Sequence, residues 1–63
     1  MSIHAINCTK EEIRAAIGKL REAYEAVTEG RVVQALSATR EATRITQHAE
    51  GALEDACPSK EAA

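Results

Sequence analysis

The 63-residue chain lacks phenylalanine and tryptophan and has one tyrosine, two cysteines, one proline and three glycines. Binding of single-stranded nucleic acid by base stacking needs aromatic platforms, so the shortage of aromatic side chains argues against it. Two cysteines are too few for a disulfide framework, and their separation does not fit a CxxC metal or redox motif. The glycines are isolated from one another, which excludes a glycine-rich phosphate loop.

A strong charge of one sign and a long apolar run are also missing. The net charge is −2, and no run of basic residues occurs, which argues against sequence-independent attraction to nucleic acid or an anionic membrane. No apolar run is long enough for a membrane span, and residues 1–6 lack the pattern of a secretory signal. We therefore expect a cytoplasmic protein with no membrane partner, and nucleic acid is not its expected partner.

Large apolar residues are scarce although the apolar fraction is 44%. Thirteen of the apolar residues are alanine, which leaves five isoleucines, three leucines, three valines and one tyrosine as large core formers. A chain this short forms one small domain at most, and so few large side chains make a weak core. The composition predicts a protein that needs a partner for stability, and it disfavours a deep pocket for a small-molecule substrate or cofactor.

The first half of the chain is predicted to form a helix over residues 9–29, after a lead segment of residues 1–8. Thr9 and Glu12 have the spacing of a capping box, which places Thr9 at the start of the helix. Gly30 is expected to end the helix in a left-handed conformation. Large apolar residues recur at spacings of four and three, which is typical of one helical stripe: Ile13, Ile17, Leu20, Tyr24 and Val27.

The second half is predicted to form a helix over residues 31–56. A seam of mostly small residues repeats every seven positions without interruption: Ala35, Ala38, Ala42, Ile45, Ala49, Ala52 and Ala56. Thr39, Thr46 and Leu53 form a parallel row beside it. A strand hairpin in this segment is disfavoured, since residues 37–40 lack turn formers and the apolar residues do not alternate. Residues 58–63, which follow the hairpin, are predicted to be a flexible tail.

Together these segments predict an all-α fold, an antiparallel two-helix hairpin over residues 9–57. Positions whose numbers add to about 60 should lie opposite each other, so that large side chains of the first helix face small ones of the second. The second helix has a face wider than one neighbour can cover, so dimerisation or a partner is expected to complete a four-helix bundle. The candidate interface residues are Ile13, Ile17, Leu20, Tyr24, Ala38, Ala42, Ile45, Ala49 and Leu53.

The residues that could support chemistry are two cysteines and two histidines. Neither Cys8 nor Cys57 has a histidine with an orienting third group at a recognisable spacing, as nucleophilic catalysis would require. His4 and Cys8 are four residues apart, while His48 and Cys57 are nine apart, so the four do not have the usual spacing of zinc ligands. We expect no catalytic residue, no metal, no cofactor and no enzymatic activity.

The charges suggest how two hairpins would pair. Arg31, Arg40 and Arg44 against Glu41 give residues 31–45 a balance of +2, whereas residues 46–63 have a balance of −3. An antiparallel dimer would bring basic and acidic ends together, although each surface pair contributes only about 0–1 kcal/mol. The leading hypothesis is a small non-catalytic interaction or assembly module that binds itself or a larger protein.

Two alternative functions come from resemblance of outline. In length, in its two heptad-bearing helices and in its acidic balance, the chain resembles the plasmid RNA-binding helical hairpins of the Rop type. That resemblance implies a small RNA- or DNA-associated regulator, with Lys10, Arg14 and Arg21 as its contact stripe. The chain also resembles the secreted WXG-type helical hairpins, but its turn is Glu29-Gly30-Arg31 and the tryptophan of their defining motif is missing.

Overall fold

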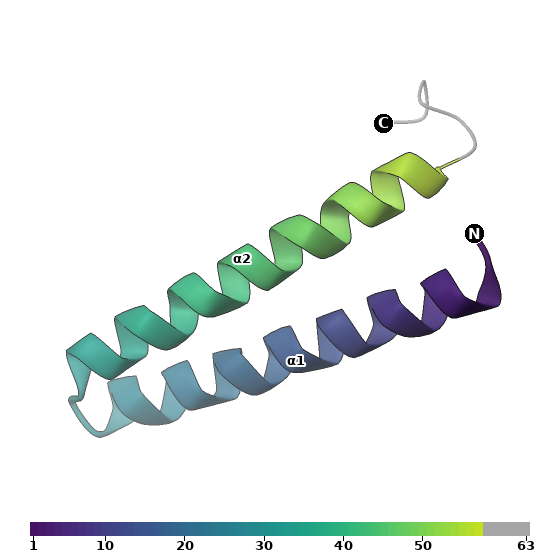
Figure 1. Ribbon diagram of the computed structural model, residues 1–63. Coiled ribbons are helices and arrows are strands. Elements are labelled where there is room, and N and C mark those ends of the chain that lie inside the picture. Colours follow the sequence, from purple (N-terminus) through teal and green to yellow (C-terminus); the bar gives the residue numbers. More distant parts are fainter. Residues whose placement is uncertain (58–63) are drawn as a thin grey trace.

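The computed structural model describes residues 1–57 as two antiparallel α-helices, α1 (Ile3–Thr28) and α2 (Val32–Ala56), joined by a short turn. The helices lie side by side along their length (Figure 1). The predicted all-helical hairpin is therefore confirmed. The predicted tail, residues 58–63, lies outside the described residues.

Helix α1 begins six residues earlier than the sequence predicts. Ser2 is the N-cap, and its hydroxyl oxygen accepts a hydrogen bond of 3.1 Å from the backbone N–H of Ala5. The prediction that Thr9 caps the helix is wrong, because Thr9 lies inside α1 and is buried. Ser2 supplies the same capping chemistry as Thr9, and the earlier start makes residues 3–8 part of the hairpin rather than a lead segment.

The turn is built around Gly30, as predicted. Gly30 has a φ of 77°, in the left-handed region. Its N–H donates to the carbonyl of Val27 at 3.0 Å, and the N–H of Arg31 donates to the carbonyl of Ala26 at 2.7 Å. These two bonds form a Schellman motif, which satisfies the last carbonyl groups of α1 and reverses the chain.

We expect Gly30→Ala to destabilise the hairpin by about 1–2 kcal/mol, because a left-handed backbone is costly for an L-residue with a side chain. Gly51 is the matched control: it lies inside α2 with open space where a Cβ would project, so Gly51→Ala should stabilise by about 0.5–1 kcal/mol. Urea unfolding at one protein concentration measures both effects. A Gly30→Ala variant as stable as Gly51→Ala would contradict the role of the turn.

The contact between the helices consists of small side chains on both sides. The buried residues are Thr9, Ala16, Ala23 and Ala26 on α1, and Ala35, Ala38, Ala42 and Ala49 on α2. Alanine lets two helix axes approach to the lower end of the usual range, about 8 Å. We call these residues the alanine seam. The part of it on α2 agrees with the predicted repeat.

The side chains of α1 that pack against α2 differ from those that were predicted. Ile17, Leu20, Tyr24 and Val27 were expected to face the small residues of α2, but all four are exposed. That prediction is wrong because alanine meets alanine across the hairpin. The predicted register does hold, since the carboxylate of Glu12 lies 2.5 Å from Nδ1 of His48, a pair whose residue numbers add to 60.

Candidate interaction surface

Most of the large apolar side chains of this protein lie on its surface. No large side chain among the described residues is completely buried. Twelve large apolar residues are exposed, and eight of them lie in two rows along α1 and α2, with between 41% and 75% of their surface exposed: Ile6, Ile13, Ile17, Leu20, Tyr24, Val27, Leu36 and Leu53. The other four lie at or near the start of a helix: Met1, Ile3, Val32 and Val33. The hairpin therefore uses alanine for its own packing and leaves its larger side chains available to another molecule.

Each of these eight residues directly follows, in the sequence, a residue that faces the other helix. One residue turns an α-helix by about 100°, so the exposed row on each helix lies nearly perpendicular to the alanine seam. In an antiparallel pair, this rotation carries both rows to the same side. We call that side the apolar face: Ile6, Lys10, Ile13, Ile17, Leu20, Tyr24 and Val27 on α1, with Leu36, Thr39, Thr43, Thr46, Glu50 and Leu53 on α2.

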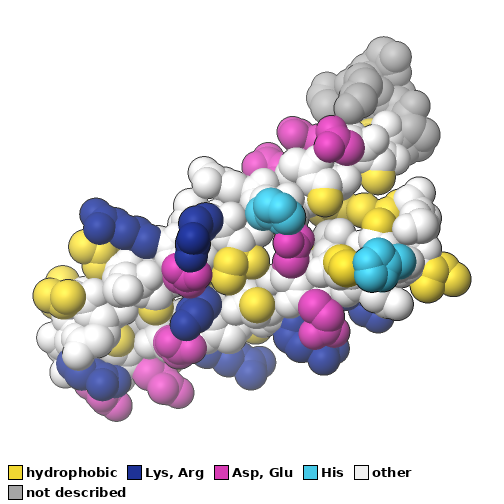
Figure 2. Space-filling model, in the orientation of Figure 1, with side chains coloured by type: hydrophobic (Ala, Val, Ile, Leu, Met, Phe, Trp, Pro, Cys, Tyr) yellow, Lys and Arg dark blue, Asp and Glu magenta, His cyan; other side chains and the backbone are white. Residues whose placement is uncertain are grey.

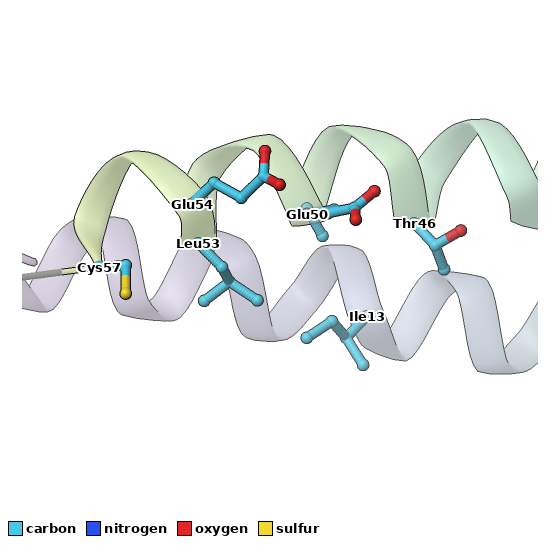
Figure 3. A pocket seen from close by; sticks show the side chains of 7 residues that line it. Ile13, Thr46, Glu50, Leu53, Glu54 and Cys57 are labelled. Atoms are coloured by element: carbon cyan, nitrogen blue, oxygen red, sulfur yellow. The ribbon is translucent and has the colours of Figure 1, made fainter. Parts of the chain in front are cut away.

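A shallow groove confirms that the two rows meet on one side of the hairpin. Ile13 of α1 lines it together with Thr46, Glu50 and Leu53 of α2 and with Cys57, the residue that follows α2. Figure 3 shows the side chains of Ile13 and Leu53 extending to the same side. The groove lies near the end of the hairpin opposite the turn, where the apolar face includes residues from both helices.

The threonines of the apolar face direct their hydroxyl groups into their own helix. Thr39 donates to the carbonyl of Ala35 at 2.8 Å, Thr43 to that of Thr39 at 3.0 Å, and Thr46 to that of Ala42 at 3.0 Å. With the hydroxyl bonded to the backbone, each threonine can present its methyl group to a neighbour. The middle of the α2 row is therefore a small and weakly polar surface, which the sequence pattern alone did not reveal.

The opposite side of the hairpin is polar. Figure 2 shows histidine, acidic and basic side chains along this side, which we call the polar face. Shallow hollows there are lined by residues such as Glu22 and Ser37, and by Ala15 and His48. Lys19 pairs with Glu22 at 3.6 Å across this surface. Among the described residues, the two sides of the hairpin thus differ in character, since the two rows of large apolar side chains lie on the other side.

The cysteines and histidines are distributed over both faces. His4 Nε2 lies 3.6 Å from Cys8 Sγ, because the early start of α1 puts both residues on one helix, four positions apart. Cys8 lines a hollow on the polar side, whereas Cys57 lines the groove of the apolar face, and no disulfide joins them. Within residues 1–57, no three or more histidine, cysteine or acidic side chains are grouped so that they could hold a metal ion.

The structure divides the predicted interface residues into two sets. Ile13, Ile17, Leu20, Tyr24 and Leu53 lie on the apolar face and are accessible. The remaining four face α1 of the same chain, three of them buried and one half-buried: Ala38, Ala42, Ala49 and Ile45. The first set is accessible to another molecule while the hairpin is closed, whereas the second set packs within the hairpin, with half-buried Ile45 reaching a hollow beside His48.

The basic residues of the nucleic-acid alternative lie on α1 and are exposed. Arg14 is 4.0 Å from Glu11, which reduces its local positive charge. Lys10 belongs to the apolar face, while Arg14 and Arg21 directly follow Ile13 and Leu20 at its outer edge. Their role as a nucleic-acid contact stripe stays a prediction.

The chain was compared with protein-family models, with curated proteins and with solved structures. None of the three comparisons gave a match. Within the part of the chain that the structure describes, neither helix is apolar enough over a sufficient length to cross a membrane.

Proposed function

We propose that this protein is a small, non-catalytic helical interaction module that assembles through its apolar face, with either a second copy of itself or a larger protein. One observation carries the proposal: eight of the twelve exposed large apolar side chains are gathered on one accessible side, while the hairpin is closed by alanine. Exposed apolar surface of this extent is typical of interaction sites.

The amount of apolar surface supports stable association. The eight large side chains are about half exposed on average. Burying them contributes about 6–12 kcal/mol per chain, if complete burial of one such side chain contributes about 1.5–3 kcal/mol. For two chains this exceeds most estimates of the cost of association, which run from about 4 to 15 kcal/mol.

The angle between the two packing surfaces supports a four-helix bundle as the assembled state. Each helix of a square bundle has two neighbours at right angles to each other. In this hairpin, the alanine seam and the exposed row are separated by about 100° on both helices. A second helical hairpin seated on the apolar face would therefore give every helix its second neighbour.

The mass and melting behaviour of the purified chain test this proposal. We expect light scattering to give a mass above that of one chain at micromolar concentration, and thermal unfolding to shift to higher temperature as protein concentration rises. A chain that is monomeric at high micromolar concentration, with a sharp melt independent of concentration, would rule the proposal out. A monomer that melts broadly would leave a larger protein as the partner.

A further inference from the structure

We propose that the occupant of the apolar face is a second copy of this chain, placed so that α1 of each copy packs on α2 of the other and Lys10 pairs with Glu50 of the second copy. This inference rests on the proposed function, and it specifies both the partner and its orientation. The charges, the register and the side-chain sizes of the apolar face support this arrangement.

Each row of the apolar face contains one charged residue. Lys10 is the charged residue of the α1 row, and Glu50 is that of the α2 row; both are exposed. Neither forms an ion pair with another described residue. A charge inside an apolar contact is costly unless an opposite charge meets it. The partner of this face must therefore bring an acidic group to Lys10 and a basic group to Glu50.

Lys10 and Glu50 lie at the same level along the hairpin. The contact of Glu12 with His48 shows that residues whose numbers add to 60 lie opposite each other. The numbers of Lys10 and Glu50 also add to 60. A second copy of the chain thus carries both of the charges that the face requires, at matching heights. The apolar face is complementary in charge to itself.

Two symmetric arrangements of two hairpins are possible, and the charges distinguish them. With the two-fold axis parallel to the helices, α1 meets α2 of the second copy at an unchanged level, so Lys10 meets Glu50. With the axis across the helices, α1 meets α1 and α2 meets α2. Lys10 would then face the α1 row of the second copy, in which the one charged residue is also a lysine. Glu50 would face the α2 row of the second copy, in which the one charged residue is also a glutamate. The first arrangement pairs every charge on the face.

Side-chain size favours the same arrangement. In the middle of the face, the α1 row carries Ile17 and Leu20, whereas the α2 row carries Thr39, Thr43 and Thr46 at corresponding levels. The threonine hydroxyls are bonded to their own helix, so small methyl groups can meet the larger aliphatic side chains. Packing α1 on α2 combines one large and one small row at both new contacts, which keeps all four helices evenly spaced.

A charge-reversal experiment with mixed chains tests the arrangement. The variant Lys10→Glu carries two acidic residues at the pairing level, and Glu50→Lys carries two basic ones. Alone, each should form homodimers at least about tenfold more weakly than the original chain, because both new pairs are repulsive. An equimolar mixture should form heterodimers whose affinity is within about threefold of the original, as measured by native mass spectrometry and sedimentation. The rescue should weaken at high salt.

The design separates loss of pairing from loss of folding. Lys10 and Arg14, like Glu50 and Glu54, are like charges four residues apart, and each reversal replaces such a pair with opposite charges, which favours the helix. Glu25→Lys is the control partner, because Glu25 directly precedes seam residue Ala26 and so lies away from the apolar face. From the original net charge of −2, both Glu25→Lys and Glu50→Lys raise the charge by two, to zero. A heterodimer of Lys10→Glu with Glu25→Lys keeps one repulsive pair of glutamates, so it should remain clearly weaker than the heterodimer of Lys10→Glu with Glu50→Lys.

The outcomes distinguish this inference from the proposed function. Full recovery of affinity with Glu50→Lys, and clearly weaker association with Glu25→Lys, supports the arrangement. A chain that dimerises but shows no weakening in the single variants, or equal rescue by both partners, overturns the arrangement and leaves the interaction module in place. A monomeric original chain with a broad melt overturns self-association and leaves a larger protein as partner, whereas a sharp, concentration-independent melt removes both proposals.

Discussion

The variant Ile17→Asp is expected to be monomeric at concentrations at which the original chain associates, with affinity reduced at least about 100-fold. Ile17 is in the middle of the α1 row and directly follows buried Ala16. An aspartate there would bring a carboxylate into each copy of the apolar contact, and a buried charge without a partner costs several kcal/mol. Sedimentation equilibrium over a wide range of concentration measures the change.

The control for this variant is Ala15→Asp, which adds the same charge two residues away on the polar side of α1. Ala15 is exposed and lines a hollow with Arg44 and His48. Its replacement should leave association within about threefold of the original chain, since surface substitutions away from packed contacts usually have small effects. Equal weakening by the two variants would show that added charge, and not the apolar face, governs association.

The variant Ala16→Leu is expected to destabilise the hairpin by at least about 1–3 kcal/mol. Ala16 is 2% exposed and faces α2 in the alanine seam. A leucine adds three carbon atoms where the helices are held close by small side chains, so α1 and α2 must separate or shift. Urea unfolding followed by circular dichroism, at one fixed protein concentration, gives the change in free energy of unfolding.

Ala15→Leu provides the matched comparison, because it makes the same substitution at the neighbouring, exposed position. Alanine and leucine have similar helix propensities, so this variant should remain within about 0.5 kcal/mol of the original. Ala42→Leu should resemble Ala16→Leu, because Ala42 is equally buried in the seam. If Ala15→Leu and Ala16→Leu were equally stable, the close contact of the helices through alanine would be refuted.

The placement of Ala42 also changes how overpacking acts on this protein. The sequence places Ala42 among the candidate interface residues, where a leucine would act on association with a partner. In the structure Ala42 faces α1 of its own chain. The primary defect should therefore lie within the hairpin, and any loss of association should follow from it.

Much of the fold could be predicted because it depends on local signals. The alternation of three- and four-residue spacings identified both helices, and Gly30 identified the turn, since few residues adopt its left-handed backbone without cost. The start of α1 was missed because Ser2 and Thr9 offer the same capping chemistry. A capping motif marks where a helix can begin, and α1 gains contact with α2 through Ala5 and Thr9 by beginning earlier.

The candidate surface was only half visible in the sequence. Ala16, Ala23 and Ala26 have the same spacing as the alanines of the second helix, a signal that could have identified the seam on α1. It was obscured because Glu12 and Lys19 occupy the same helical side and because larger residues follow each position. Large apolar residues are usually taken as the core, since their burial contributes most to stability.

The amino-acid sequence is sufficient for the helical class, the turn and the level at which residues of the two helices meet, because each follows from the period and conformation of the backbone. It does not establish which of two adjacent apolar stripes on α1 packs inside the hairpin. That choice depends on how closely two folded helices can approach: alanine against alanine closes the hairpin and leaves the isoleucine and leucine side chains outside. The shortage of large core residues and the exposed apolar face thus have the same physical origin, which is the close packing of the two helices through alanine.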